Sequence, residues 1–87
     1  MKVLYSGEAN HYMDFCQRYE MQPADVPLVH DPDHLRGFKD CLFVTGFGME
    51  WIENDRILKS YCWNHNITIM SEREFAQKYS EGEFNAA

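Results

Sequence analysis

The sequence has no long hydrophobic run and few basic residues. Lys and Arg number 8 of 87 residues, against 14 Asp and Glu, and the formal net charge is −6. A general binder of nucleic acid or of anionic membranes needs a basic face, so the composition argues against both classes. The apolar stretches are also far shorter than the ~18–20 residues of a membrane-spanning helix. We therefore expect a soluble protein without direct contact to nucleic acid or membrane.

The sequence is also poor in cysteine and has no CxxC motif. Its three cysteines are Cys16, Cys41 and Cys62. An odd number without a disulfide-like framework favours a reducing compartment, so we expect a cytoplasmic protein. A closed zinc site needs four Cys or His ligands. His30 and His34 have ligand-like spacing, and so do Cys62 and His65. Without a CxxC pair they do not complete such a set, and we predict no metal.

Phosphate-binding fingerprints are missing as well. The chain contains neither GxGxxG nor GxxxxGK[ST], which excludes the dinucleotide fingerprint and the Walker A loop. We therefore predict no nucleotide or other cofactor.

What the sequence does contain is enough apolar material for one core. Hydrophobic residues make up 45% of the chain and aromatic residues 15%. This length and composition predict a single domain over residues 1–87, with a frayed tail at 81–87.

Apolar runs and helical periodicities alternate along the chain. We expect strands at 2–5, 26–29, 41–45 and 67–70. We expect helices at 8–20, 54–63 and 71–80, and a short helix at 31–37. Strands that alternate with helices form right-handed crossovers and a mostly parallel sheet. The sequence thus predicts a small three-layer, Rossmann-like α/β sandwich with a four-stranded sheet. Numbered along the chain, the preferred strand order is 2-1-3-4.

Several residues support this layout. Pro27 lacks an amide donor, which places 26–29 at an edge of the sheet, whereas 41–45 reads as the buried central strand. Ser71 and Glu74 form a capping box. The helix at 54–63 is expected to begin at Asn54 or Asp55. Its predicted buried stripe consists of Ile57, Leu58, Tyr61 and Cys62.

In this order a ligand site would lie where the strands at 2–5 and 41–45 end. The residues there are Ser6, Gly7, Thr45 and Gly46, with His30 on the neighbouring strand. One interpretation is a cradle of backbone amides for a small ligand or nucleotide. The other is that the glycines are turn residues in short loops. Ser6 and His30 are the only nucleophile and base that this topology brings together. No third group accompanies them, so we expect a non-enzymatic protein without catalytic residues.

Large aromatic side chains near the ends of elements suggest a second kind of site. Phe47, Trp51 and Trp63 lie where a small core does not readily reach them, with Glu50 beside Trp51. Exposed aromatics with polar neighbours are typical of protein-binding hot spots. The alternative is that Trp51 folds back over the core.

Residues 32–46 resemble a segment of phage terminase and helicase ATPases. In that segment a Pro-Asp pair and a Leu-Arg-Gly motif precede a hydrophobic strand, as PDHLRG at 32–37 precedes CLFV at 41–44 here. In those families the strand ends in an acidic motif that holds magnesium; here it ends in Thr45-Gly46. The resemblance implies a P-loop-like or Rossmann-like core without the hydrolytic residues. The whole layout also resembles small Rossmann-like proteins encoded by bacteriophages.

The sequence therefore leads to one main hypothesis and one alternative. The main hypothesis is a non-enzymatic protein-interaction domain, such as a small phage accessory protein that modulates a host protein. Its acidic surface favours a partner with a basic face. The alternative is a small-ligand or nucleotide-binding module at the loops after the first and third strands. The chain is expected to be a monomer or a homodimer, the latter through a sheet edge or an aromatic patch.

Overall fold

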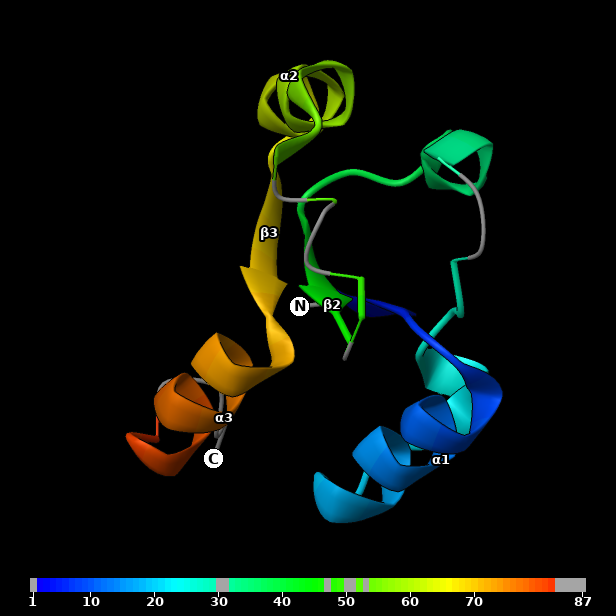
Figure 1. Ribbon diagram of the computed structural model, residues 1–87, viewed down its shortest axis with the longest axis vertical. Helices are drawn as coiled ribbons and strands as arrows, with labels where there is room; N and C mark the ends of the chain where they lie inside the picture. Colours follow the sequence, from blue (N-terminus) through cyan, green and yellow to red (C-terminus); the bar gives the residue numbers. More distant parts are fainter. Residues whose placement is uncertain (1, 30–31, 47, 50–51, 53, 83–87) are drawn as a thin grey trace.

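The computed structural model describes residues 2–29, 32–46, 48–49, 52 and 54–82. They form a parallel sheet with helices on both faces, as Figure 1 shows. The strands, in sheet order, are β1 (Lys2–Ser6), β2 (Cys41–Thr45) and β3 (Ile67–Ser71). The helices are α1 (Ala9–Arg18), α2 (Arg56–Asn64) and α3 (Glu72–Ser80), with short 3-10 helices η1 (Pro23–Asp25) and η2 (Pro32–Leu35). The predicted α/β class with a parallel sheet is confirmed.

The predicted strand at 26–29, which would make the sheet four-stranded, is wrong. The sheet has three strands, and this segment joins β1 through one isolated parallel bridge between Tyr5 and Leu28. The amide of Tyr5 donates to the carbonyl oxygen of Pro27 at 3.0 Å, and the amide of Val29 donates to that of Tyr5 at 2.7 Å. Proline has no amide hydrogen to extend the ladder further. The segment thus covers the outer edge of β1 without becoming a strand.

β2 is the central strand, as the sequence predicts. All five of its residues are buried, and it pairs in parallel with β1 on one side and β3 on the other. In this register Leu4, Phe43 and Ile69 lie in one row across the sheet. A strand buried on both faces needs apolar residues throughout, which explains the unbroken run at 41–44.

Helix ends follow the local sequence. The carboxylate of Asp55 accepts hydrogen bonds from the amides of Ile57 and Leu58, both at 3.1 Å, and so caps α2. The hydroxyl of Ser71 accepts from the amide of Glu74 at 3.2 Å, which confirms the predicted cap of α3. After α2, Asn66 has a φ of 55°, a left-handed conformation that asparagine tolerates well.

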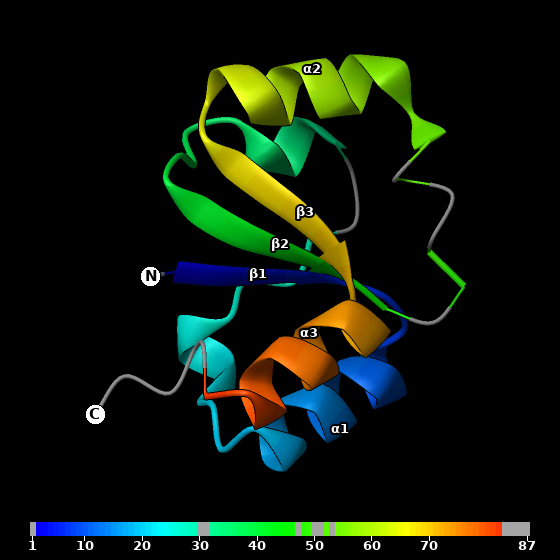
Figure 2. The same ribbon diagram turned by 90° about the vertical axis from the view of Figure 1, so that its left-hand side faces the viewer.

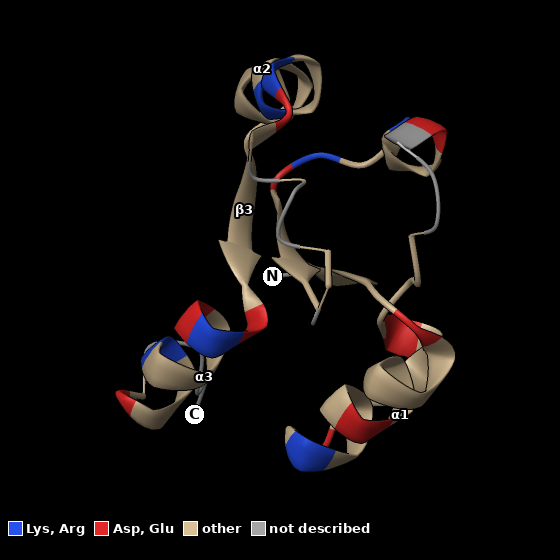
Figure 3. Ribbon diagram, viewed as in Figure 1, with Lys and Arg blue, Asp and Glu red and all other residues tan. Residues whose placement is uncertain are grey.

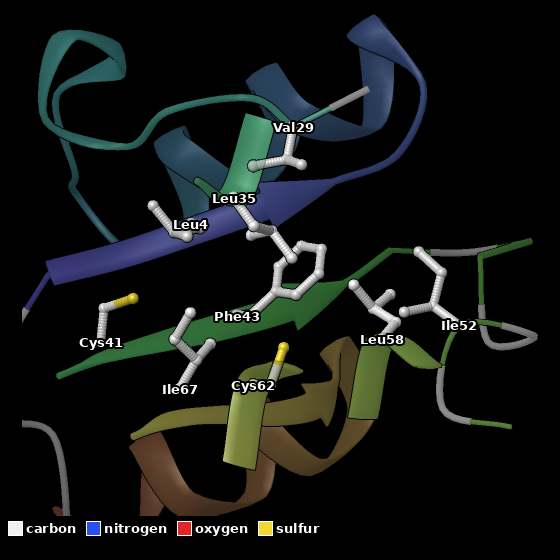
Figure 4. Close-up of a cluster of buried hydrophobic side chains, with 9 residues drawn as sticks. All are labelled: Leu4, Val29, Leu35, Cys41, Phe43, Ile52, Leu58, Cys62 and Ile67. Carbon is white, nitrogen blue, oxygen red and sulfur yellow. The ribbon is translucent and has the colours of Figure 1, made fainter. Parts of the chain in front are cut away.

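Helices cover both faces of the sheet, as Figure 2 shows. On one face, α2 and η2 form an upper layer over a cluster of buried side chains. Figure 4 shows these side chains converging from all three strands, η2 and α2 around Phe43. On the other face, α1 and α3 form a lower layer around a second cluster rich in aromatic rings.

The aromatic rings hold α1 and α3 together. Phe15 and Phe75 lie 5.2 Å apart between ring centroids, and Tyr19 lies 4.9 Å from Phe75 and 4.8 Å from Tyr79. Tilted and edge-on pairs at these distances each contribute about 0.5–1.5 kcal/mol beyond the area they bury. These rings fill the space between the two helices.

One residue of the predicted α2 stripe is misplaced. Leu58 and Cys62 are buried and Tyr61 is partly buried, but Ile57 is 85% exposed. Successive residues turn by about 100° around a helix, so Ile57 lies beyond Tyr61 and outside the face that meets the sheet. An apolar residue adjacent in sequence to the stripe was thus mistaken for part of it.

Over the ranges that the structure covers, no helix is long and apolar enough to cross a membrane.

Candidate functional site

The strand ends bring three hydroxyl residues into one row. Ser6, Thr45 and Ser71 close β1, β2 and β3 in register, so they lie at the same edge of the parallel sheet. Ser6 and Thr45 are both buried. The hydroxyl of Thr45 donates to the carbonyl oxygen of Met70 at 3.4 Å, while that of Ser71 caps α3. The predicted neighbours Ser6 and Thr45 are thus brought together, and two of the three hydroxyls serve the fold.

Gly46 keeps β1 and β2 joined past their ends. Its amide donates to the carbonyl oxygen of Ser6 at 2.6 Å. In open α/β sheets a ligand usually enters a crevice that begins outside the carboxyl ends of the strands at this point of the sheet. Here the amide of Gly46, the first residue after β2, makes the last hydrogen bond of the β1–β2 ladder to Ser6 at the end of β1.

Both predicted cradle glycines contact the ring of Tyr5. A Cβ atom on Gly46 would lie 2.7 Å from Cζ of Tyr5 and 2.9 Å from the carbonyl oxygen of Ser6. A Cβ atom on Gly7 would lie 2.9 Å from Cε1 of Tyr5. Carbon atoms do not normally approach so closely, so any larger residue would have to displace Tyr5, and this favours glycine here whether or not a ligand binds. This reason was not visible in the sequence, because it depends on Tyr5 lying beneath both loops.

The hydroxyl of Tyr5 reaches the start of α3. It donates a hydrogen bond to Oε2 of Glu72 at 3.1 Å. Burial and the negative charge of Glu72 raise the pKa of Tyr5 well above its ordinary value. Glu8 immediately precedes α1, and Glu72 and Glu74 lie in the first turn of α3, so carboxylates lie near the positive ends of both helix dipoles. This edge therefore attracts an anionic ligand weakly.

Four predicted site residues lie outside the described residues. They are His30, Phe47, Glu50 and Trp51. The pairing of Ser6 with His30 and the exposure of the two aromatics therefore stay predictions.

The cysteines have the properties of buried core residues. Cys16, Cys41 and Cys62 are free and buried, and burial raises the pKa of each thiol. For Cys62 the pKa rises to about 11, with a further contribution from nearby Cys41. Thiols with raised pKa are poor nucleophiles and poor metal ligands. Among the residues that the structure describes, no group of three or more His, Cys, Asp or Glu side chains could hold a metal ion.

The outer side of α2 is the other candidate. Ile57 and Trp63 are each 85% exposed. Ser60 lies three residues from both, and residues three apart are neighbours on a helix surface. The two apolar side chains lie on either side of Ser60 along one i±3 ridge but point about 120° apart around the helix, and the basic residues Arg56 and Lys59 lie next to Trp63. We call Arg56, Ile57, Lys59, Ser60 and Trp63 the α2 surface.

The charge of the α2 surface differs from that of the protein as a whole. Between residues 56 and 64 there is no acidic residue. Figure 3 shows the basic residues of α2 in the upper layer and acidic residues spread over α1 and α3 below. Acidic residues of the lower layer are Glu8, Asp14, Glu20, Asp25, Glu72, Glu74 and Glu81, and its basic residues are Arg18, Arg73 and Lys78. The upper layer carries both signs, with Arg36, Lys39, Arg56 and Lys59 beside Asp33, Asp40 and Asp55, so among the described residues the lower layer is the more acidic one.

The sequence predicted part of this surface. Trp63 was expected near the end of an element, beyond the reach of the core, and its 85% exposure agrees with that. The exposure of Ile57 was missed, although strict 3.6-residue spacing from Leu58 and Cys62 would have placed it outside the stripe.

Compared with protein-family models, curated proteins and solved structures, the chain matches none of them. Function is therefore inferred from the geometry of the described residues.

Proposed function

We propose that this protein is a non-enzymatic protein-binding module on a Rossmann-like scaffold, and that the α2 surface contacts the partner. The single observation that carries the proposal is the 85% exposure of both Ile57 and Trp63 on one helix. Tryptophan and other large apolar side chains supply most of the binding energy in many protein interfaces. The fold buries only the side of α2 that carries Leu58 and Cys62, so the rest of the helix is open to a partner.

The charges around the ridge indicate the chemistry of the partner. Arg56 and Lys59 lie beside Trp63 on the helix surface, and the helix carries no carboxylate. A complementary surface has an apolar pocket with an acidic rim. This differs from the basic partner that the net charge of −6 suggests. A basic partner suits the acidic lower layer, whereas the exposed apolar residues lie in the upper one.

Fewer observations support the small-ligand alternative than support the main proposal. Its residues Ser6, Gly7, Thr45 and Gly46 do meet at one edge, but Tyr5 favours glycine at both glycine positions and the strand ends are hydrogen-bonded together. A thermal-shift screen with nucleotides and small anions tests it, because a ligand of the native state raises the melting temperature by mass action.

An affinity pulldown from the cells that make the protein tests the main proposal. The wild-type chain is expected to capture a partner, and Ile57→Ala and Trp63→Ala are expected to lose it. Met13→Ala is the matched control, because Met13 is also exposed, at 47%, but lies on α1. A partner that all three variants retain would exclude the α2 surface.

A further inference from the structure

The two edges of the sheet are treated differently by the chain. Residues 26–29, with Pro27 among them, cover the outer edge of β1 through two backbone hydrogen bonds. At the other edge, β3 pairs only with β2 among the described residues. An uncovered edge presents backbone donors and acceptors to any chain that can add a strand.

β3 also lacks the usual protection of an edge strand. Its sequence is ITIMS, without a charged residue, a proline or a glycine. Natural edge strands normally carry one of these, or a bulge, to prevent pairing with other chains. The pairing of β3 with β2 is continuous over all five residues, so no bulge interrupts it.

α2 places a basic and an aromatic side chain on the side of this edge. Tyr61 points toward η2, because its hydroxyl donates to the carbonyl oxygen of Leu35 at 3.2 Å. Lys59 and Trp63 are each two residues away, which is about 200° around the helix. They therefore lie on the side of α2 away from η2, with Trp63 farther from the buried stripe than Lys59. Figure 1 shows η2 on the β1 side of the sheet, so this is the side of the β3 edge. The nearby carboxylate of Asp55 is already engaged by the amides of Ile57 and Leu58.

We propose that the open edge of β3 binds an extended segment of a partner protein as an added strand, with an acidic side chain of that segment facing Lys59. Backbone hydrogen bonds along Ile67–Ser71 supply the affinity that does not depend on sequence. Every second side chain of the segment faces α2, where Lys59 favours a carboxylate and Trp63 favours an apolar group. The inference goes beyond the proposed function, because it concerns the backbone of β3 and does not need Ile57.

A second copy of this chain fits the open edge of β3 less well than an extended segment does. Antiparallel pairing of two β3 edges about a two-fold axis would bring α2 beside the other α2, and α3 beside the other α3. Lys59 would then approach the same basic residue of the copy. Figure 1 also shows α3 extending past β3 on its open side, where the copy's α3 would have to lie. A single extended segment avoids both conflicts and gains α3 as a surface beneath it.

Selection from a library of random peptides about ten residues long, a length that covers a strand, tests the proposal on the full chain. Selected peptides are expected to slow amide hydrogen exchange over Ile67–Ser71 and to contain Asp or Glu. Lys59→Glu is expected to weaken their binding at least about fivefold, whereas the matched charge reversal Lys39→Glu, also exposed and in the upper layer, changes it less than about twofold. Thermal melts confirm that both variants are folded.

The possible outcomes separate the two proposals. If no peptide is selected, or if bound peptides leave exchange at Ile67–Ser71 unchanged, strand addition is excluded. Binding that Lys59→Glu and Lys39→Glu weaken equally excludes the role of Lys59. Analytical ultracentrifugation of the free chain that shows a dimer would make a second copy the occupant and overturn the proposal. Ile57→Ala should leave peptide binding intact, so failure of the α2 surface in the pulldown does not affect this result.

Discussion

The hydroxyl of Tyr5 donates a hydrogen bond of 3.1 Å to Oε2 of Glu72, which ties the end of β1 to the first turn of α3. The two residues are 67 positions apart in the sequence. The ring of Tyr5 reaches Glu72 by passing beneath Gly7 and Gly46, where any larger residue would collide with it. A core residue therefore occupies the place where the sequence suggested a ligand cradle.

Replacing Gly46 tests this close approach. In Gly46→Ala the added methyl group would overlap Cζ of Tyr5 and the backbone oxygen of Ser6, and backbone cannot move as easily as a side chain. We expect the free energy of unfolding to fall by about 1–3 kcal/mol, as for other overpacked sites. Urea denaturation measures the change.

The control for Gly46 is Gly7→Ala. There the close atoms belong only to the side chain of Tyr5, which can shift, and the loss is expected to be smaller. The lower entropy of alanine in the unfolded chain offsets about 0.4–1 kcal/mol of it. Equal or reversed losses at the two positions would contradict the arrangement of Tyr5.

Tyr5 also predicts weaker stability in alkaline solution. Folding raises its pKa, so above pH about 10 the unfolded chain loses the phenolic proton before the folded one does. The contribution of this group to stability is complete below that pH. Above it, the free energy of unfolding falls by at most about 1.4 kcal/mol per pH unit.

Comparing wild type with Tyr5→Phe isolates this effect. Urea denaturation at a series of pH values should show a smaller loss of stability above pH about 10 in Tyr5→Phe. Tyr12 and Tyr19, whose pKa values are also raised by burial, keep part of the slope in both proteins. Identical slopes would mean that Tyr5 titrates normally in the folded protein.

The cap of α2 should contribute measurably to stability. Asp55 accepts from two amides of the first turn, and Asp55→Ala leaves both without this acceptor. We expect a loss of about 1 kcal/mol in the free energy of unfolding. Asp55→Asn keeps a side-chain oxygen acceptor and is expected to lose only a small part of that. If the two variants are equally unstable, the charge of Asp55 and not the cap bond is responsible.

The ridge of α2 should be nearly neutral for folding. Ile57→Ala and Trp63→Ala remove side chains that are 85% exposed, so each should change the free energy of unfolding by less than about 0.5 kcal/mol. Leu58→Ala, one residue from Ile57 but only 4% exposed, is expected to cost about 2–4 kcal/mol. A large loss in Ile57→Ala would show that this side chain packs in the fold and is not held for a partner.

Local features of this protein could be predicted from its sequence. The apolar run at 41–44 predicted a central buried strand, and Ser71 with Glu74 predicted the start of the last helix. Such features follow from neighbouring residues: side-chain periodicity, backbone preference and capping act within a few positions. The class of fold followed from the order of those elements.

The roles of residues that lie far apart in the sequence but contact each other depend on the tertiary structure. Residues 26–29 form one isolated bridge and not a strand, because Pro27 and the hydrogen bonds of Tyr5 determine how far the pairing with β1 extends. Gly7 and Gly46, which the sequence suggested as ligand contacts, leave room for the ring of Tyr5. Distances between residues far apart in sequence set each of these outcomes, and no local pattern encodes such distances.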